Sequence, residues 1–148
     1  SSLPEPDEPH VALWHLATLQ REYRSGCHLL AIGAAGLDGC ASIVSHVAVG
    51  QAPEIWITDE AGWSEAEAAA AADRLRARGW LDADGRATEA CHQGRAAIEA
   101  MTDELDGQRW AALGQADTDR LHTLMSTLIA PLPPDDQLDW QQIYGDDR

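Results

Sequence analysis

The chain has 148 residues, a length typical of one domain, and its 25 carboxylates against 10 basic residues give a formal net charge of -15. Every basic residue is an arginine, and the hydrophobic share of 45% fits a folded globular chain rather than an acidic disordered one. This charge disfavours nucleic acids and anionic membranes as partners, unless the arginines gather on one face.

Three helices are predicted in the first third of the chain. The run HVALWHLATLQREYR carries an apolar stripe at helical spacing, and we expect this helix to end at Gly26. A second, short apolar helix, CHLLAIGAAG, ends at Gly36. Asp38 is a good N-cap for the third helix, which stops at Gly50.

Helix-start signals follow from Pro53 onward. Pro53 is placed to begin a short helix, EIWITDE. Ser64, with Glu67 three residues later, forms the capping box of a stronger helix, EAEAAAAADRLRAR. Three arginines complement the dipole at the end of that helix, and Gly79 terminates it.

A tight hairpin and two long helices are predicted next. The dipeptide Asp84-Gly85 favours a hairpin turn between two very short strands, residues 80–81 and 86–88. Long helices follow over about residues 89–105 and 108–128.

This order of elements is that of a winged helix-turn-helix. We therefore expect a mainly α fold, a winged helix-turn-helix with a short two-stranded β-wing and long C-terminal helices. The expected organisation is a linker or arm at 1–9, N-terminal helices at 10–52, the winged helix-turn-helix at 53–106, a C-terminal dimerisation helix at 107–130 and an acidic tail at 131–148.

Part of the chain resembles a known family. The segment SEAEAAAAADRLRARGWLDADGRATEACHQGRAAIE resembles the second half of a MarR-type winged helix. Arg74, Leu75 and Gly79 match the end of the recognition helix in that family, although the wing is only DADGR and the glycine after Thr88 comes later than usual. The resemblance implies a dimeric, ligand-responsive regulator.

A second resemblance covers almost the whole chain. The run LPEPDEPHVALWHLATLQREYRSGCHLLAIGAAGLDGCASIVSHVAVG is similar to the C-terminal half of actinobacterial SalK-type helix-turn-helix proteins, which are roughly twice this length. That similarity implies the fold and an additional N-terminal domain or second chain. It implies no particular activity, because a fold does not dictate function.

DNA binding is left open. The predicted recognition helix begins with serine and glutamates, and its arginines lie at the far end, where they can also cap the helix. Acids far outnumber arginines over residues 53–106, so no basic face is visible. If DNA is bound, the candidate residues are Ser64, Arg74, Arg78 and Arg86.

No catalytic or metal motif is present. The three cysteines lack CxxC spacing, which indicates reduced structural thiols in a cytoplasmic protein. His28 and His46 fall in consecutive helices and can approach each other, with Glu22 or Cys27 nearby, yet nothing in the spacing demands a metal. We expect no metal, no cofactor, no membrane association and no enzyme activity from this chain alone.

Tryptophan dominates the few aromatic residues and suggests a ligand site. In MarR-like proteins, small aromatic ligands bind at the junction between the first helices and the helix-turn-helix. The resemblance therefore predicts a small-molecule pocket there, with these ligand-binding candidates: Trp14, His15, Arg24, His28, Trp56 and Trp63. The alternative is that these tryptophans are core anchors that replace the missing phenylalanines.

Two main functions follow. The first is a MarR-like protein that binds a small aromatic molecule, a ligand-responsive transcriptional regulator acting as a homodimer. The second is a non-DNA-binding winged-helix half of a longer biosynthetic or small-molecule-handling protein. A third option is an interaction module acting through Trp140 and Tyr144.

Overall fold

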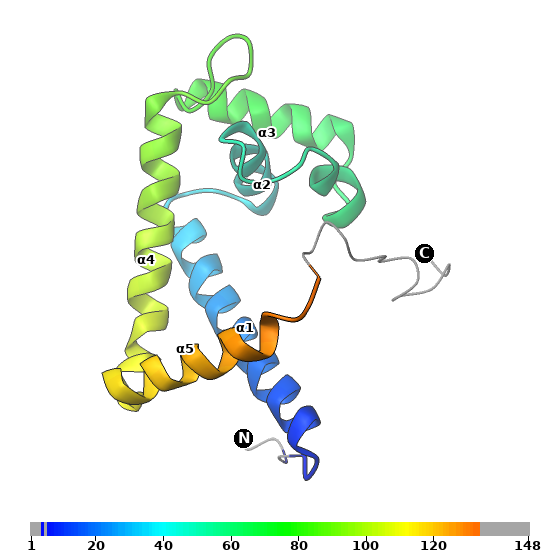
Figure 1. The fold of residues 1–148 in the computed structure, drawn as a ribbon. Helices are drawn as coiled ribbons and strands as arrows, with labels where there is room; N and C mark the ends of the chain where they lie inside the picture. Colours follow the sequence, from blue (N-terminus) through cyan, green and yellow to red (C-terminus); the bar gives the residue numbers. More distant parts are fainter. Residues whose placement is uncertain (1–3, 5, 134–148) are drawn as a thin grey trace. The chain divides into compact units, whose positions relative to one another are not determined.

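The computed structural model describes residue 4 and residues 6–133, which include five α-helices and one short π-helix (Figure 1). In chain order these elements are α1 Pro9–Ala34, α2 Gly39–Ala48, η1 Trp56–Glu60, α3 Glu65–Ala77, α4 Glu89–Leu113 and α5 Gln115–Ile129. The chain forms two compact units, one up to Gly107 and one from Gln108 onward. The first unit contains the candidate site, and Trp140 and Tyr144 lie outside the described residues.

The first two predicted helices are one continuous helix, α1, so the expected break at Gly26 is wrong. A glycine inside a helix costs only about 1 kcal/mol relative to alanine. That cost is outweighed because the last two turns of α1 bury Cys27, and also Ala31 and Ile32, which belong to the hydrophobic core.

The predicted helix starts at α2 and α3 are confirmed. The Asp38 carboxylate accepts a hydrogen bond from the Ala41 amide at 2.8 Å, which caps α2. Ser64 and Glu67 form the full capping box of α3: the Glu67 carboxylate accepts from the Ser64 amide at 2.9 Å, and the Ser64 hydroxyl accepts from the Glu67 amide at 3.3 Å.

The core of the first unit lies where α2 packs against α3 and η1 and where α4 closes the other side. Its most deeply buried members are small or branched, which lets the helices approach closely. The buried apolar residues of this core are Ala31, Ile32, Leu37, Cys40, Ala41, Val44, Ala71, Leu75, Trp80, Leu81, Cys91 and Ile98.

The expected two-stranded β-wing is wrong. Among the described residues there is no β-strand, and the hairpin contains a single isolated antiparallel bridge between Leu81 and Ala87. The amides of Trp80 and Leu81 are directed to the Leu75 carbonyl at the end of α3 instead of to a partner strand. Across the hairpin, the Asp82 amide donates to the Arg86 carbonyl and the Thr88 amide to the Trp80 carbonyl, each at 2.9 Å. These bonds flank a single bridge pair, which is too short to count as a β-ladder.

The boundary between the two long helices also differs from the prediction. α4 continues to Leu113, and the break falls at Gly114, whose φ of 79° is a left-handed conformation that favours glycine. The second unit contains the last residues of α4 and the whole of α5, which has no buried residue among those described.

No single helix of the described segment is long and apolar enough to cross a membrane. Only α1 and α2 taken together reach that length and composition, and the two are bent by 93° relative to each other.

Candidate functional site

The three predicted ligand-binding tryptophans have different surroundings. The Trp14 side chain, on α1, is 75% exposed. Trp56, on η1, is about half exposed, whereas Trp63 packs against the hydrophobic core beside Gly39. Of the predicted aromatic site, Trp63 therefore packs on the core and Trp14 lies largely in solvent.

Arg24 and His28, by contrast, line a surface hollow of about 460 Å³, whereas His15 lies half-buried on α1 outside this lining. This volume falls within the range of small-molecule sites in proteins. The lining comes from α1, α2 and α4, namely Arg21, Arg24, Ser25, His28, Leu29, His46 and Glu99. We call this feature the α1–α2–α4 hollow.

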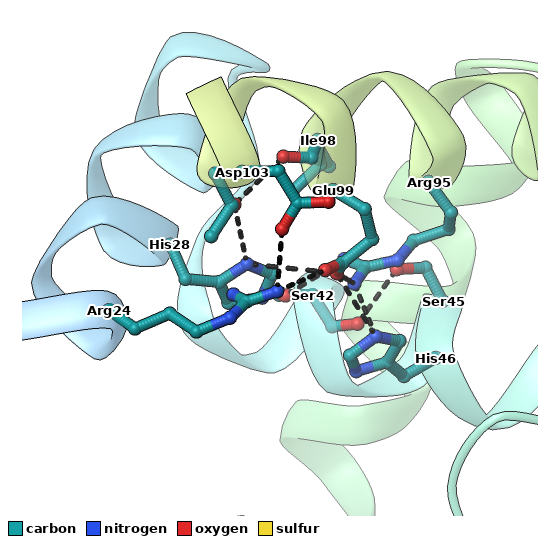
Figure 2. Close-up of polar contacts among 10 residues, drawn as sticks. Arg24, His28, Ser42, Ser45, His46, Arg95, Ile98, Glu99 and Asp103 are labelled. Atoms are coloured by element: carbon teal, nitrogen blue, oxygen red, sulfur yellow. Dashed lines mark hydrogen bonds and ion pairs between the residues drawn. The ribbon is translucent and has the colours of Figure 1, made fainter. Parts of the chain in front are cut away.

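Glu99 lies at the centre of the polar contacts in the hollow (Figure 2). Its Oε1 is 3.1 Å from Arg95 Nη2, 3.7 Å from His28 Nδ1 and 3.9 Å from His46 Nε2. Its Oε2 is 3.6 Å from Arg24 Nη2. Nitrogen-bearing side chains from three helices therefore converge on one carboxylate, and only that of Arg95 lies within hydrogen-bonding distance.

Arg95 is the most unusual residue of the site, because its side chain is only 2% exposed. Its guanidinium donates to Glu99, to the Ser42 hydroxyl at 3.4 Å and to His46 Nε2. Within the described part of the chain, Arg95 Nε is a buried polar atom without a hydrogen-bond partner. A buried arginine with an unsatisfied donor is costly for stability, which is a reason to consider a functional role.

The hydrogen bonds determine the tautomers of the two imidazoles. The Thr102 hydroxyl donates its one proton to the Ile98 carbonyl at 2.8 Å, so His28 Nδ1, 3.0 Å from that hydroxyl, carries a proton and donates. Arg95 can only donate, so His46 Nε2 accepts and its proton is on Nδ1. The His46 assignment describes a neutral ring, because its Nε2 carries no proton, whereas a donating Nδ1 on His28 fits both a neutral and a charged ring.

The electrostatic surroundings also favour neutral imidazoles. Burial lowers the pKa of His28 from its ordinary value, and Arg95 and Arg24 lower it further, while Glu99 opposes them. Burial likewise lowers the pKa of His46, with Arg95 acting in the same direction and Glu99 against it. The two rings are stacked, with centroids 6.2 Å apart and planes 13° from parallel.

The predicted approach of His28 and His46 is therefore confirmed, but the neighbouring carboxylate is Glu99 rather than Glu22. No group of three or more histidine, cysteine or acidic residues in the described segment has the geometry to hold a metal ion. The Arg95 guanidinium beside His46 also disfavours a cation there.

Two of the candidate DNA-binding residues, Ser64 at the N-cap of α3 and Arg74 within α3, have partners within the protein. The Ser64 hydroxyl takes part in the capping box with Glu67. Arg74 Nη2 lies 2.8 Å from Asp38 Oδ2, so this arginine joins the end of α3 to the start of α2.

The other two candidates lie at the loop after α3. Arg78 stacks on Trp80, with its guanidinium carbon 4.4 Å from the centre of the ring. Arg86 Nη1 lies 2.6 Å from Asp84 Oδ2. All four candidates thus interact with acids or rings of the same unit, and the structure does not gather them into a free basic face.

Comparison with known proteins identifies the class of the chain. A model described as a helix-turn-helix family matches residues 1–135. The chain belongs to this helix-turn-helix family. No curated protein and no solved structure gives a significant match. Within the fold, α2 packs against both η1 and α3.

The sequence interpretation missed Arg95, Glu99 and Thr102. A signal for two of them was present, because Arg95 and Thr102 share a helical face with Cys91 and Ile98 at spacings of three and four residues. A charged residue on the apolar face of an amphipathic helix indicates a buried charge.

Proposed function

We propose that this helix-turn-helix protein is a ligand-responsive regulator that binds a small molecule in the α1–α2–α4 hollow. The observation that carries the proposal is the hollow itself, where Arg24, His28, His46 and Glu99 converge above the buried Arg95. Convergent polar groups in a concave site are the usual arrangement for recognition of a small ligand.

The position of the hollow supports a regulatory role. His46, which lines the hollow, and Ser42, which accepts from Arg95, both lie on α2. α2 packs against α3, and the Asp38–Arg74 ion pair joins the two helices. A ligand that moves α2 relative to α4 therefore also moves α3, the recognition helix of a MarR-type arrangement.

The ligand site is tested by titrating the protein with small benzene derivatives that are anionic, neutral or cationic. Long-range proton–nitrogen NMR spectra resolve each imidazole. We expect at least one compound to shift the signals of His28 and His46, while those of the exposed His10, His92 and His122 stay in place. If no compound shifts the His28 or the His46 signal at millimolar concentration, the proposed ligand site is wrong.

A second candidate is a ligand-binding helix-turn-helix protein that does not contact DNA. The acids beside Arg74 and Arg86 favour it, because their negative charge offsets the positive charge that attracts a phosphate backbone. Fluorescence anisotropy with DNA from upstream of the gene, at low salt, separates the two candidates. Binding at micromolar protein supports the regulator, and its absence supports the second candidate.

A further inference from the structure

The Arg95 guanidinium joins α4 to α2 (Figure 2). It donates to the Ser42 hydroxyl at 3.4 Å and to His46 Nε2, and both of these partners lie on α2. The bond to Ser42 is long, so the contact with His46 is the closer of the two, and we call it the Arg95–His46 link. Asp38 and Arg74 in turn join α2 to α3, so the link connects α4 with the part of the fold that contains α2 and α3.

The link exists only while His46 Nε2 carries no proton. A guanidinium has donors and no acceptor, and it stays charged between about pH 5 and 8. His46 Nδ1 already holds a proton, so an additional proton can bind only at Nε2, the atom that Arg95 contacts. His28 differs, because its Nδ1 donates to Thr102 and its Nε2 can take a proton while that bond stays.

The groups around His46 do not fully compensate for a positive charge on its ring. The titratable and charged groups that face it are His28 from α1 and Arg95 and Glu99 from α4. The Glu99 Oε1 is closer to Arg95, at 3.1 Å, than to His46, at 3.9 Å, and its Oε2 lies 3.6 Å from Arg24. One carboxylate therefore already faces two permanent positive charges, and burial adds to the cost of a third.

We propose that protonation of His46 breaks the Arg95–His46 link and loosens α2 from α4, which makes this contact a pH-sensitive switch. A proton from solvent can reach the ring, because 27% of the His46 side chain is exposed. The imidazolium then turns toward solvent, and the guanidinium keeps its pair with Glu99 within α4. The helix α2 moves together with α3, since the two stay packed and paired. The switch requires no ligand in the hollow, so its failure would leave the proposed function in place.

The size of the effect follows from the linkage between protonation and opening. Burial and the Arg95 charge lower the pKa of His46 in the closed form, so the open form binds the proton first and is favoured as the pH falls. An exposed imidazole has a pKa of about 6.5, so complete exclusion of the proton would raise the opening equilibrium constant about tenfold from pH 7.5 to 5.5. Glu99 opposes the other groups, and we therefore expect a rise of about three- to tenfold.

Amide hydrogen exchange measured by NMR at pH 7.5 and 5.5 tests the switch, with rates corrected for the intrinsic pH dependence of exchange. We expect the protection factors of residues 43–48 in α2 to fall about three- to tenfold at pH 5.5, whereas those of residues 95–103 in α4 change less than about twofold. His46→Gln should abolish the response, since the glutamine oxygen can accept from Arg95 and takes no proton. His92→Gln, which removes an exposed histidine from α4, is the matched control and should keep the full response.

A second variant separates the link from the effect of burial alone. In Arg95→Met no guanidinium faces Nε2, so we expect His46 to titrate at a higher pH than in the wild type and the α2 response to fall below about twofold. Long-range proton–nitrogen NMR spectra follow that ring. An unchanged His46 midpoint in this variant would overturn the proposal, because burial alone would then keep the proton away. Equal loss of protection in α2 and α4 of the wild type, or a full response in His46→Gln, would overturn it as well.

Discussion

Replacing Arg95 with methionine is expected to leave the stability of the first unit nearly unchanged. The side chain is only 2% exposed, and its unpartnered Nε is a buried donor that costs about 1–3 kcal/mol, a cost that the substitution removes. Against this gain, Ser42 and His46 each lose a hydrogen bond, while the Glu99 carboxylate, which is partly exposed, can turn to water instead of remaining as a buried unpaired charge. We expect the two effects nearly to cancel, with a change of less than about 1 kcal/mol in the free energy of unfolding.

Glu99→Gln is the matched control, because it removes the carboxylate and leaves the buried cation. We expect it to lower the free energy of unfolding by about 1–3 kcal/mol, less than for a fully buried pair. Urea denaturation followed by far-UV circular dichroism measures both variants, with equal m-values as the check that the transitions are comparable. If Arg95→Met lowers the free energy of unfolding by more than about 2 kcal/mol, the reasoning is refuted, since Arg95 would then stabilise the fold and would not serve mainly to shape the hollow.

Three further results are expected. Gly94→Ala should lower the free energy of unfolding by about 1–3 kcal/mol, because a Cβ there overlaps the buried Trp80 indole. Gly26→Ala has open space around it and should raise the free energy of unfolding by up to about 1 kcal/mol. Urea denaturation measures both changes. The free energy of unfolding should fall as the pH drops below about 6.5, because the pKa values of His28 and His46 are lowered in the folded state and the unfolded chain therefore binds protons first. Replacing both histidines with glutamine should flatten this dependence between pH 7.5 and 5.5. Size-exclusion chromatography with light scattering should show a homodimer.

Each of these expectations has a clear contrary result. Equal effects of the two glycine substitutions would mean that the Trp80 ring adapts to the added methyl group. A pH dependence that persists in the double glutamine variant would place the responsible groups outside the hollow. A monomer at micromolar concentration would remove the expectation of a homodimer, and with it the MarR-type assembly.

Local signals in the sequence were enough to predict most helix starts and ends. Asp38 caps α2, and Ser64 with Glu67 caps α3, because these contacts span only a few residues and depend little on the rest of the fold. Gly26 misled the prediction, since burial of the residues after it outweighs its intrinsic cost. The hairpin signal at Asp84-Gly85 correctly indicated a turn but not its lack of a β-ladder.

The site was only partly predictable, for a different reason. The sequence predicted Arg24 and His28 as ligand-binding residues, and it suggested that His46 approaches His28. The helical face of α4 offered a signal that Arg95 is buried, but nothing indicated the partners of Arg95 and Glu99, because their contacts join helices that are about 50 to 75 residues apart in the chain. Such juxtapositions depend on helix packing, which single-sequence periodicity does not specify.

A crystal structure of the protein soaked with the benzene derivative that most strongly shifts the His28 and His46 signals would test the central claim most directly. We predict that this compound lies within the α1–α2–α4 hollow, in contact with Arg24 and His28. An empty hollow, at a concentration of the compound that saturates the protein in solution, would contradict the account.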